Sequence, residues 1–142
     1  MIRFLQVNVA KNLPNVKAKT ELKNGAAVAY NPASNEVENA TGKCLYLVKA
    51  AEVYNGYNAV RMPSDGEFET IPTGGICHMV PVYVGERYAT TEVTADGLTA
   101  GARIAASAGK FVASGEGEWQ YVGEYADPTG LKMYEIVYNP IV

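Results

Sequence analysis

Three side chains in this chain are of the types that most often bind metals or act as nucleophiles: Cys44, Cys77 and His78, the one histidine. A zinc site requires three or four ligands, and no CxxC spacing is present. Cys77 and His78 are adjacent, so on a strand their side chains would point to opposite faces. We therefore expect a structural or surface histidine and no metal site.

Two pairs of carboxylates have i, i+2 spacing: Glu67 with Glu69, and Glu116 with Glu118. Two carboxylates held across a cleft can hydrolyse glycosides. On one face of a single strand, however, Glu67 and Glu69 are more typical of a charged edge that discourages aggregation. Glu116 and Glu118 alternate with glycine, and a flexible loop positions catalytic groups poorly. Neither pair therefore predicts catalysis.

Two glycine-rich stretches, at 74–75 and 115–117, share only their composition with phosphate-binding loops. Neither stretch is followed by Lys-Ser/Thr or by a predicted helix, and the phosphate-loop motifs require that context. We predict no catalytic residue, no metal and no cofactor, and we expect that the protein is not an enzyme.

The composition limits the class of protein and its partners. The chain has 142 residues, 48% of them hydrophobic and 19% charged, which is typical of one globular domain or two very small ones. The net charge is −3 and the basic residues are scattered, which argues against a nucleic-acid partner. No apolar run is long enough to span a membrane, and the N-terminus does not resemble a signal peptide. We therefore expect synthesis in a reducing cytoplasm and two free thiols.

The residues between these candidates form short β-prone runs, with turn signals about every ten residues. The run at 44–48 is continuously apolar, as in a central strand. The run at 76–84 contains Pro81, which predicts an edge or a kink because proline cannot donate a ladder hydrogen bond. The pattern predicts an all-β fold, a small antiparallel β-sandwich or barrel, with at most one helical turn near 50–54.

Two stretches repeat each other at a constant offset of 76 residues (98 − 22). The matched pairs are Leu22 with Leu98, Gly25 with Gly101, Ala26 with Ala102, Val28 with Ile104, and Ala29 with Ala105. A turn signal follows each stretch, and a second short run returns after it. The sequence therefore predicts two related hairpins, at 22–38 and 98–113.

Both ends of the chain read as apolar strands. Leu5, Val7 and Val9 alternate with polar residues, and residues 133–142 are also apolar. A strand added to the chain's own sheet explains this pattern, and so does an arm laid on a neighbouring subunit. Since exposed apolar ends would aggregate, we expect residues 1–9 and 133–142 to be ordered mainly by contacts between subunits. We accordingly divide the chain into an N-terminal arm, 1–19, and a β domain, 20–142.

Ten tyrosines are the strongest compositional bias. Tyrosine is enriched at protein interfaces because it offers rigid apolar area with a polar tip, but it also suits half-buried sheets. The predicted interface residues combine the aromatic strands with the chain ends: Leu5, Val7, Val9, Trp119, Tyr121, Tyr125, Ile136 and Tyr138.

Two features of the sequence are the repeated Leu-x-x-Gly-Ala-x-Ile/Val-Ala units and the stretch Asp-Gly-Leu-Thr-Ala-Gly at 96–101. In these features the chain resembles the head decoration proteins of tailed bacteriophages, also called cement or auxiliary capsid proteins. The resemblance covers mainly 20–38 and 96–123. It implies a structural β-domain, often a homotrimer, on the outside of the virion, where it binds the major capsid protein and stabilises the shell. Unlike such families, this chain has no long N-terminal arm.

A carbohydrate- or receptor-binding β-module of a phage tail or fibre is the alternative hypothesis. In that case Trp119, Tyr121 and Tyr125 would form a platform on which sugar rings stack. Co-sedimentation of the protein with assembled shells would support the capsid-binding hypothesis. Glycan binding by the isolated protein would support the carbohydrate-binding hypothesis.

Overall fold

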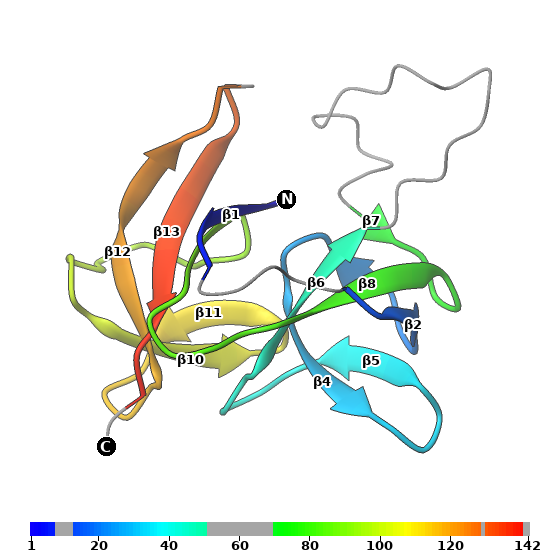
Figure 1. Cartoon of the computed structure of the whole chain (residues 1–142). Helices are drawn as coiled ribbons and strands as arrows, with labels where there is room; N and C mark the ends of the chain where they lie inside the picture. Colours follow the sequence, from blue (N-terminus) through cyan, green and yellow to red (C-terminus); the bar gives the residue numbers. More distant parts are fainter. Residues whose placement is uncertain (8–12, 51–69, 129, 141–142) are drawn as a thin grey trace.

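The computed structural model describes residues 1–7, 13–50, 70–128 and 130–140, and none of these forms a helix. Three sheets hold the strands (Figure 1). The six-stranded sheet contains, in spatial order, β1 (Ile2–Gln6), β9 (Arg87–Thr90), β13 (Lys132–Tyr138), β12 (Trp119–Ala126), β10 (Arg103–Ser107) and β11 (Lys110–Ala113). The closed five-stranded barrel contains β2 (Asn15–Ala18), β5 (Glu36–Asn39), β4 (Ala27–Asn31), β6 (Tyr46–Ala50) and β8 (Ile76–Pro81). The third sheet pairs β3 (Leu22–Lys23) with β7 (Thr70–Ile71). The all-β prediction is confirmed.

The two predicted hairpins are present as β4–β5 and β10–β11. Adding the offset of 76 to the bounds of β4 gives the bounds of β10. A tight turn precedes each of these strands: Ala26 N–H donates to Lys23 C=O at 3.0 Å, and Ala102 N–H donates to Thr99 C=O at 3.0 Å. The third residue of each turn is glycine with positive φ, +93° at Gly25 and +88° at Gly101, which glycine adopts cheaply.

The repeat continues beyond the hairpins. In the barrel Leu47 of β6 pairs with Val80 of β8, and in the six-stranded sheet Gln120 of β12 pairs with Val137 of β13. Leu47 therefore corresponds to Gln120, at an offset of 73 (120 − 47), and Val80 corresponds to Val137, at an offset of 57 (137 − 80). The strand order β5-β4-β6-β8 is therefore repeated as β11-β10-β12-β13. The sequence did not reveal this part of the repeat.

The closing strands of the two units correspond as well. In the barrel β2 runs parallel to β5 and antiparallel to β8, and Lys19 N–H donates to Val37 C=O at 2.9 Å. In the six-stranded sheet β9 runs antiparallel to β13, and the residues after it form a parallel bridge between Val93 and Phe111, where Thr94 N–H donates to Phe111 C=O at 2.9 Å. We call β2, β4, β5, β6 and β8 the first barrel, and β9–β13 with residues 92–94 the second barrel. The two units thus share one order and direction of strands, and the second unit has β1 added to β9.

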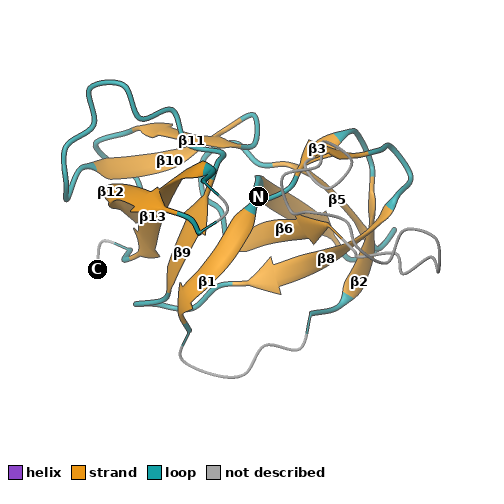
Figure 2. Cartoon of the chain, turned by 90° about the horizontal axis from the view of Figure 1, so that it is seen from above, coloured by secondary structure: helices purple, strands orange, loops and turns teal. Residues whose placement is uncertain are grey.

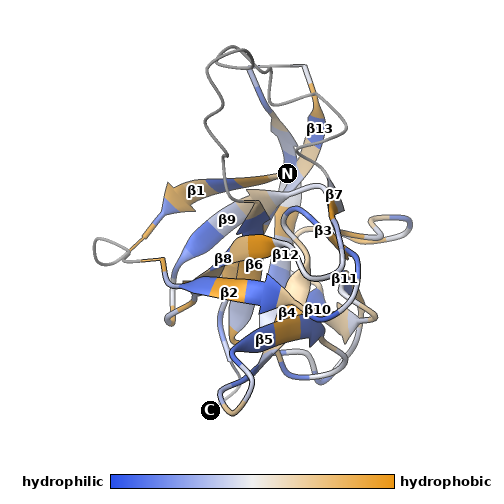
Figure 3. Cartoon of the chain, turned by 90° about the vertical axis from the view of Figure 1, so that its right-hand side faces the viewer, coloured by the Kyte–Doolittle hydropathy of each residue, from blue (hydrophilic) through white to orange (hydrophobic). Residues whose placement is uncertain are grey.

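The two barrels share a core. Figure 2 shows β10–β13 on one side, the first barrel on the other, and β1 and β9 between them. Trp119 of β12 is 1% exposed, packs against Phe111, Tyr88 and Tyr138, and donates its indole N–H to Cys44 C=O of the first barrel at 3.0 Å. Figure 3 shows the hydrophobic residues of β6 and β8 near the centre of the molecule. A separate cluster, which includes Val28, Val48 and Cys77, fills the first barrel.

The chain ends differ from the prediction. β1 pairs with β9 of the same chain, and Met1 and Ile2 are 4% and 5% exposed. β13 lies between β9 and β12, inside the six-stranded sheet. For the described residues 1–7 and 133–140, the expectation of ordering mainly by contacts between subunits is therefore wrong. Alternation of apolar residues predicts a half-buried strand, but it does not say which chain supplies the neighbouring strand.

For Pro81, which predicted an edge or a kink, the edge alternative is wrong. β8 is not an edge strand, because it pairs with β6 on one side and β2 on the other. Pro81 is the last residue of β8, opposite Tyr46, and Val82 N–H makes the next bond, to Leu45 C=O at 3.1 Å. Proline is tolerated at this end of the strand.

Candidate contact surface

Four of the eight predicted interface residues are buried within the chain itself. Trp119 and Tyr121 are 1% and 6% exposed, and Ile136 and Tyr138 are also buried. All four belong to the shared core. These side chains therefore offer no surface to a partner, and the rings of Trp119 and Tyr121 have no exposed face on which a sugar could stack.

The other predicted interface residues lie nearer the surface. Leu5 and Tyr125 are half-buried and pack against a small cluster of Met1, Ala89 and Met133. Val7 is also half-buried, but it packs against the shared core. Val9 lies outside the described residues. The structure thus does not bring the predicted residues together into one exposed surface.

An ion pair fixes β1 to the loop after β12. Arg3 Nε donates to Asp127 Oδ1 at 2.9 Å, and Arg3 Nη2 donates to Asp127 Oδ2 at 3.4 Å. The Asp127 side chain is fully buried, whereas that of Arg3 is 38% exposed. The hydrogen bond to Asp127 is the main cause that raises the pKa of Arg3. This contact holds residues 1–7 within the fold rather than freeing them as an arm.

The side chains first considered for chemistry have structural environments. Cys44 and Cys77 are free thiols, and burial raises the pKa of each to about 11, which makes both poor nucleophiles at neutral pH. Cys77 lies inside the first barrel and His78, the next residue, is half-buried. Among the described residues, no group of three or more His, Cys, Asp or Glu side chains could hold a metal ion. Glu67 and Glu69 lie outside the described residues.

The second carboxylate pair does not form a site either. Glu116 is exposed, whereas Glu118 accepts a hydrogen bond from the Tyr138 hydroxyl at 3.2 Å. Glu118 also pairs with Lys43 Nζ at 3.5 Å. The two carboxylates therefore have different surroundings, and the contacts of Glu118 link the two barrels.

Three large apolar side chains are exposed on neighbouring segments of the chain. Leu45, Tyr83 and Val84 are 49%, 52% and 60% exposed. They are neighbours because Val82 N–H, next to Tyr83, donates to Leu45 C=O at 3.1 Å. We call Leu45, Tyr83 and Val84 the apolar patch. Clustered exposed apolar side chains are typical of interaction sites, whereas single ones are ordinary.

A rigid turn carries two residues of the patch. Residues 83–86 form a tight turn in which Glu86 N–H donates to Tyr83 C=O at 3.1 Å, and Gly85 has a φ of +87°. The Glu86 side chain is 0% exposed, and its Oε1 accepts hydrogen bonds from Tyr83 N–H at 2.7 Å and from the Tyr88 hydroxyl at 3.1 Å. Burial raises the pKa of Tyr88, and the charge of Glu86 raises it further. The buried carboxylate of Glu86 thus holds the turn in place through its hydrogen bond to Tyr83 N–H.

Sequence reasoning missed the patch. The signal was present, because Tyr83 and Val84 are apolar residues within a turn, where polar residues are the rule. The proximity of Leu45 could not be predicted, since it depends on the pairing of β6 with β8.

The chain gives no significant match to any protein-family model, curated protein sequence or solved structure. No helix of the described residues could cross a membrane.

Proposed function

We propose that this protein is a structural virion protein that binds the outside of an assembled phage capsid as a homotrimer and stabilises the shell. Its partner in this proposal is the major capsid protein, and it performs no catalysis. The repeated Gly-Ala units, which resemble head decoration proteins, support the proposal. The observation that carries it is the apolar patch, held on a turn that a buried carboxylate fixes.

The fold favours contact through side chains over contact through added strands. The first barrel is closed, and the bridge between Val93 and Phe111 covers the outer edge of β11. Among the described strands of the six-stranded sheet, this leaves β1 at the uncovered edge. A specific interface buries roughly 800 Å² per partner around an apolar centre with a polar rim. The apolar patch supplies such a centre, and the nearby ion pair of Lys43 and Glu118 supplies part of a rim.

The experiment compares two variants with equally conservative changes at exposed apolar positions. Leu45→Ser with Val84→Ser removes most of the patch, and Ile76→Ser changes a side chain that is 61% exposed at the start of β8. The probe is the assembled shell of the phage that encodes the protein, stripped of decoration. Since truncation of a central apolar contact costs about 2 kcal/mol or more, co-sedimentation of the patch variant should weaken by roughly 30-fold. The Ile76→Ser variant should bind like the parent.

Three results would contradict the proposal. The parent protein fails to sediment with the shells, it is absent from purified virions by mass spectrometry, or the patch variant binds as well as the parent. Sedimentation velocity of the free and shell-released protein tests the trimer separately, because a monomer in both samples removes the homotrimer without removing shell binding.

A further inference from the structure

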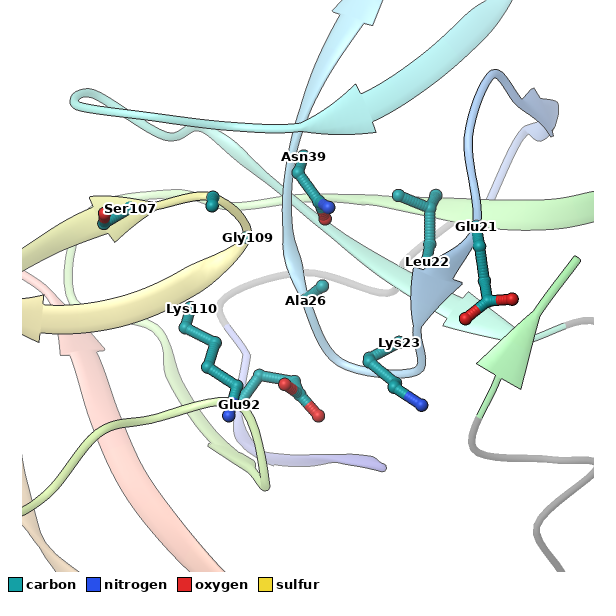
Figure 4. Close-up of a pocket in the computed structure, with 10 residues that line it drawn as sticks. Glu21, Leu22, Lys23, Ala26, Asn39, Glu92, Ser107, Gly109 and Lys110 are labelled. Carbon is teal, nitrogen blue, oxygen red and sulfur yellow. The ribbon is translucent and has the colours of Figure 1, made fainter. Parts of the chain in front are cut away.

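A cavity of about 310 Å³ lies where the two barrels meet (Figure 4). The first barrel and β3 supply one wall, which includes Glu21, Leu22 and Lys23. The second barrel supplies the other wall, which includes Glu92 and Lys110. This volume lies at the lower end of the range of small-molecule sites, roughly 300–1,000 Å³.

Backbone contacts fix the wall that the second barrel supplies. The tip of the β10–β11 hairpin is bound to the first barrel, because Ala27 N–H donates to Gly109 C=O at 2.9 Å and Gly109 N–H donates to Ala40 C=O at 3.0 Å. Gly109 has a φ of +86°, and a Cβ atom there would lie 2.2 Å from Asn39 Oδ1. The packing is therefore tight at this point, and the cavity beside it is preformed.

The charges on the two walls are balanced. Each wall carries one carboxylate and one ammonium group: Glu21 with Lys23, and Glu92 with Lys110. Figure 4 shows the side chains of Glu92 and Lys110 on one side of the cavity and those of Glu21 and Lys23 on the other.

Two of these charges have no partner among the described residues: the Glu21 carboxylate and the Lys110 ammonium group. The other two have one neutral partner each. Lys23 Nζ donates to the Thr70 hydroxyl at 2.9 Å, and Glu92 Oε1 accepts a hydrogen bond from the Thr91 hydroxyl at 3.3 Å. The cavity thus presents unpaired groups of both signs on opposite walls.

The lining excludes several ligand classes. An inorganic anion attracted by Lys23 and Lys110 would be repelled by the carboxylates of Glu21 and Glu92. A simple cation would be attracted by these carboxylates and repelled by the two lysines. None of the described residues that line the cavity is aromatic, so these residues offer no ring on which a sugar could stack. Leu22 and Ala26 also border the cavity, but both are buried, at 1% and 2% exposed.

We propose that this cavity binds a small zwitterion of dipeptide size, with its ammonium group at Glu21 and its carboxylate at Lys110. An extended dipeptide spans about 7 Å. Such a ligand pairs both of the unpartnered charges at once and leaves the net charge of the site unchanged. The proposal does not depend on shell binding.

The test uses the full chain labelled with ¹⁵N and alanyl-alanine as the probe. Amide resonances of residues 107–110 should shift with a dissociation constant of about 1 mM or below, which corresponds to about 4 kcal/mol. N-acetyl-alanyl-alanine lacks the ammonium group and alanyl-alanine amide lacks the carboxylate, so each should bind at least roughly tenfold more weakly, as expected for the loss of one charge-assisted hydrogen bond.

Matched variants locate the site. Lys110→Gln and Glu21→Gln should each weaken alanyl-alanine binding by roughly tenfold, because each removes one of the two charges without shortening the side chain much. Lys17→Gln, an exposed change on β2 outside the cavity, should bind like the parent. The proposal is overturned if the probe causes no shift at residues 107–110 at about 20 mM, far above the expected dissociation constant. It is also overturned if the blocked dipeptides bind as well as alanyl-alanine.

Discussion

Replacing Glu86 by alanine should destabilise the protein far more than its position in a surface turn suggests. The side chain is 0% exposed, and its Oε1 accepts hydrogen bonds from Tyr83 N–H and from the Tyr88 hydroxyl. The bond from the Tyr88 hydroxyl is buried, whereas that from Tyr83 N–H is part-buried. A buried donor left without an acceptor costs about 1–3 kcal/mol, so Glu86→Ala should lower the free energy of unfolding by about 1–3 kcal/mol or more. That is a large part of the 5–15 kcal/mol that typically stabilises a protein.

Glu86→Gln is the matched control, because the amide oxygen still accepts one hydrogen bond in a side chain of the same length. We expect it to cost less than half as much as Glu86→Ala. Urea denaturation at pH 7 measures both, with fluorescence of Trp119, the one tryptophan, as the probe of the shared core. A buried charge such as the Glu86 carboxylate can itself destabilise the folded state, because burial removes it from water. The reasoning is refuted if Glu86→Ala unfolds at the same urea concentration as the parent, or if Glu86→Gln costs as much.

Two further predictions use the same assay. Gly109→Ala should cost more than Gly74→Ala, because both residues have positive φ but only at Gly109 would a Cβ meet Asn39; equal costs would show that this contact is soft. The pKa of Cys44 and Cys77 is raised from 9.0 to about 11, so the unfolded chain loses these protons first, and the contribution of the two thiols to stability should be constant below pH 9 and fall between pH 9 and 11. Replacing either residue by alanine should reduce that slope, and an unchanged slope would assign it to other groups.

The sequence revealed the repeat only in the first turn and first strand of each unit, where residue types match. Gly25 and Gly101 match because the turn before each first strand needs positive φ. The later strands need only alternation of buried and exposed side chains, so Leu47 in one copy can correspond to Gln120 in the other. For the later strands the evidence of the repeat is therefore the hydrogen-bond register, and matching residue types do not contribute to it.

The candidate surface was predicted poorly for a related reason. The sequence placed Trp119 and Tyr121 on an aromatic strand, but a strand pattern does not distinguish a side chain that faces the core from one that faces a partner. Here the aromatic face of β12 turns inward, against the first barrel. The exposed apolar residues lie instead at a turn, Tyr83 and Val84, where no periodic pattern reports on burial.

The turns of the two hairpins explain why the two barrels are not interchangeable. In the first hairpin Asn31 pairs with Glu36 around a four-residue loop, and in the second Ser107 pairs with Lys110 around a two-residue turn. The short turn fits against the first barrel through the two hydrogen bonds of Gly109, whereas the residues of the longer loop, 32–35, are exposed. One copy therefore uses its hairpin tip to build the junction, and the other leaves its tip at the surface. This asymmetry places the cavity of about 310 Å³ beside the tip of the β10–β11 hairpin, so a ligand bound there would contact both barrels.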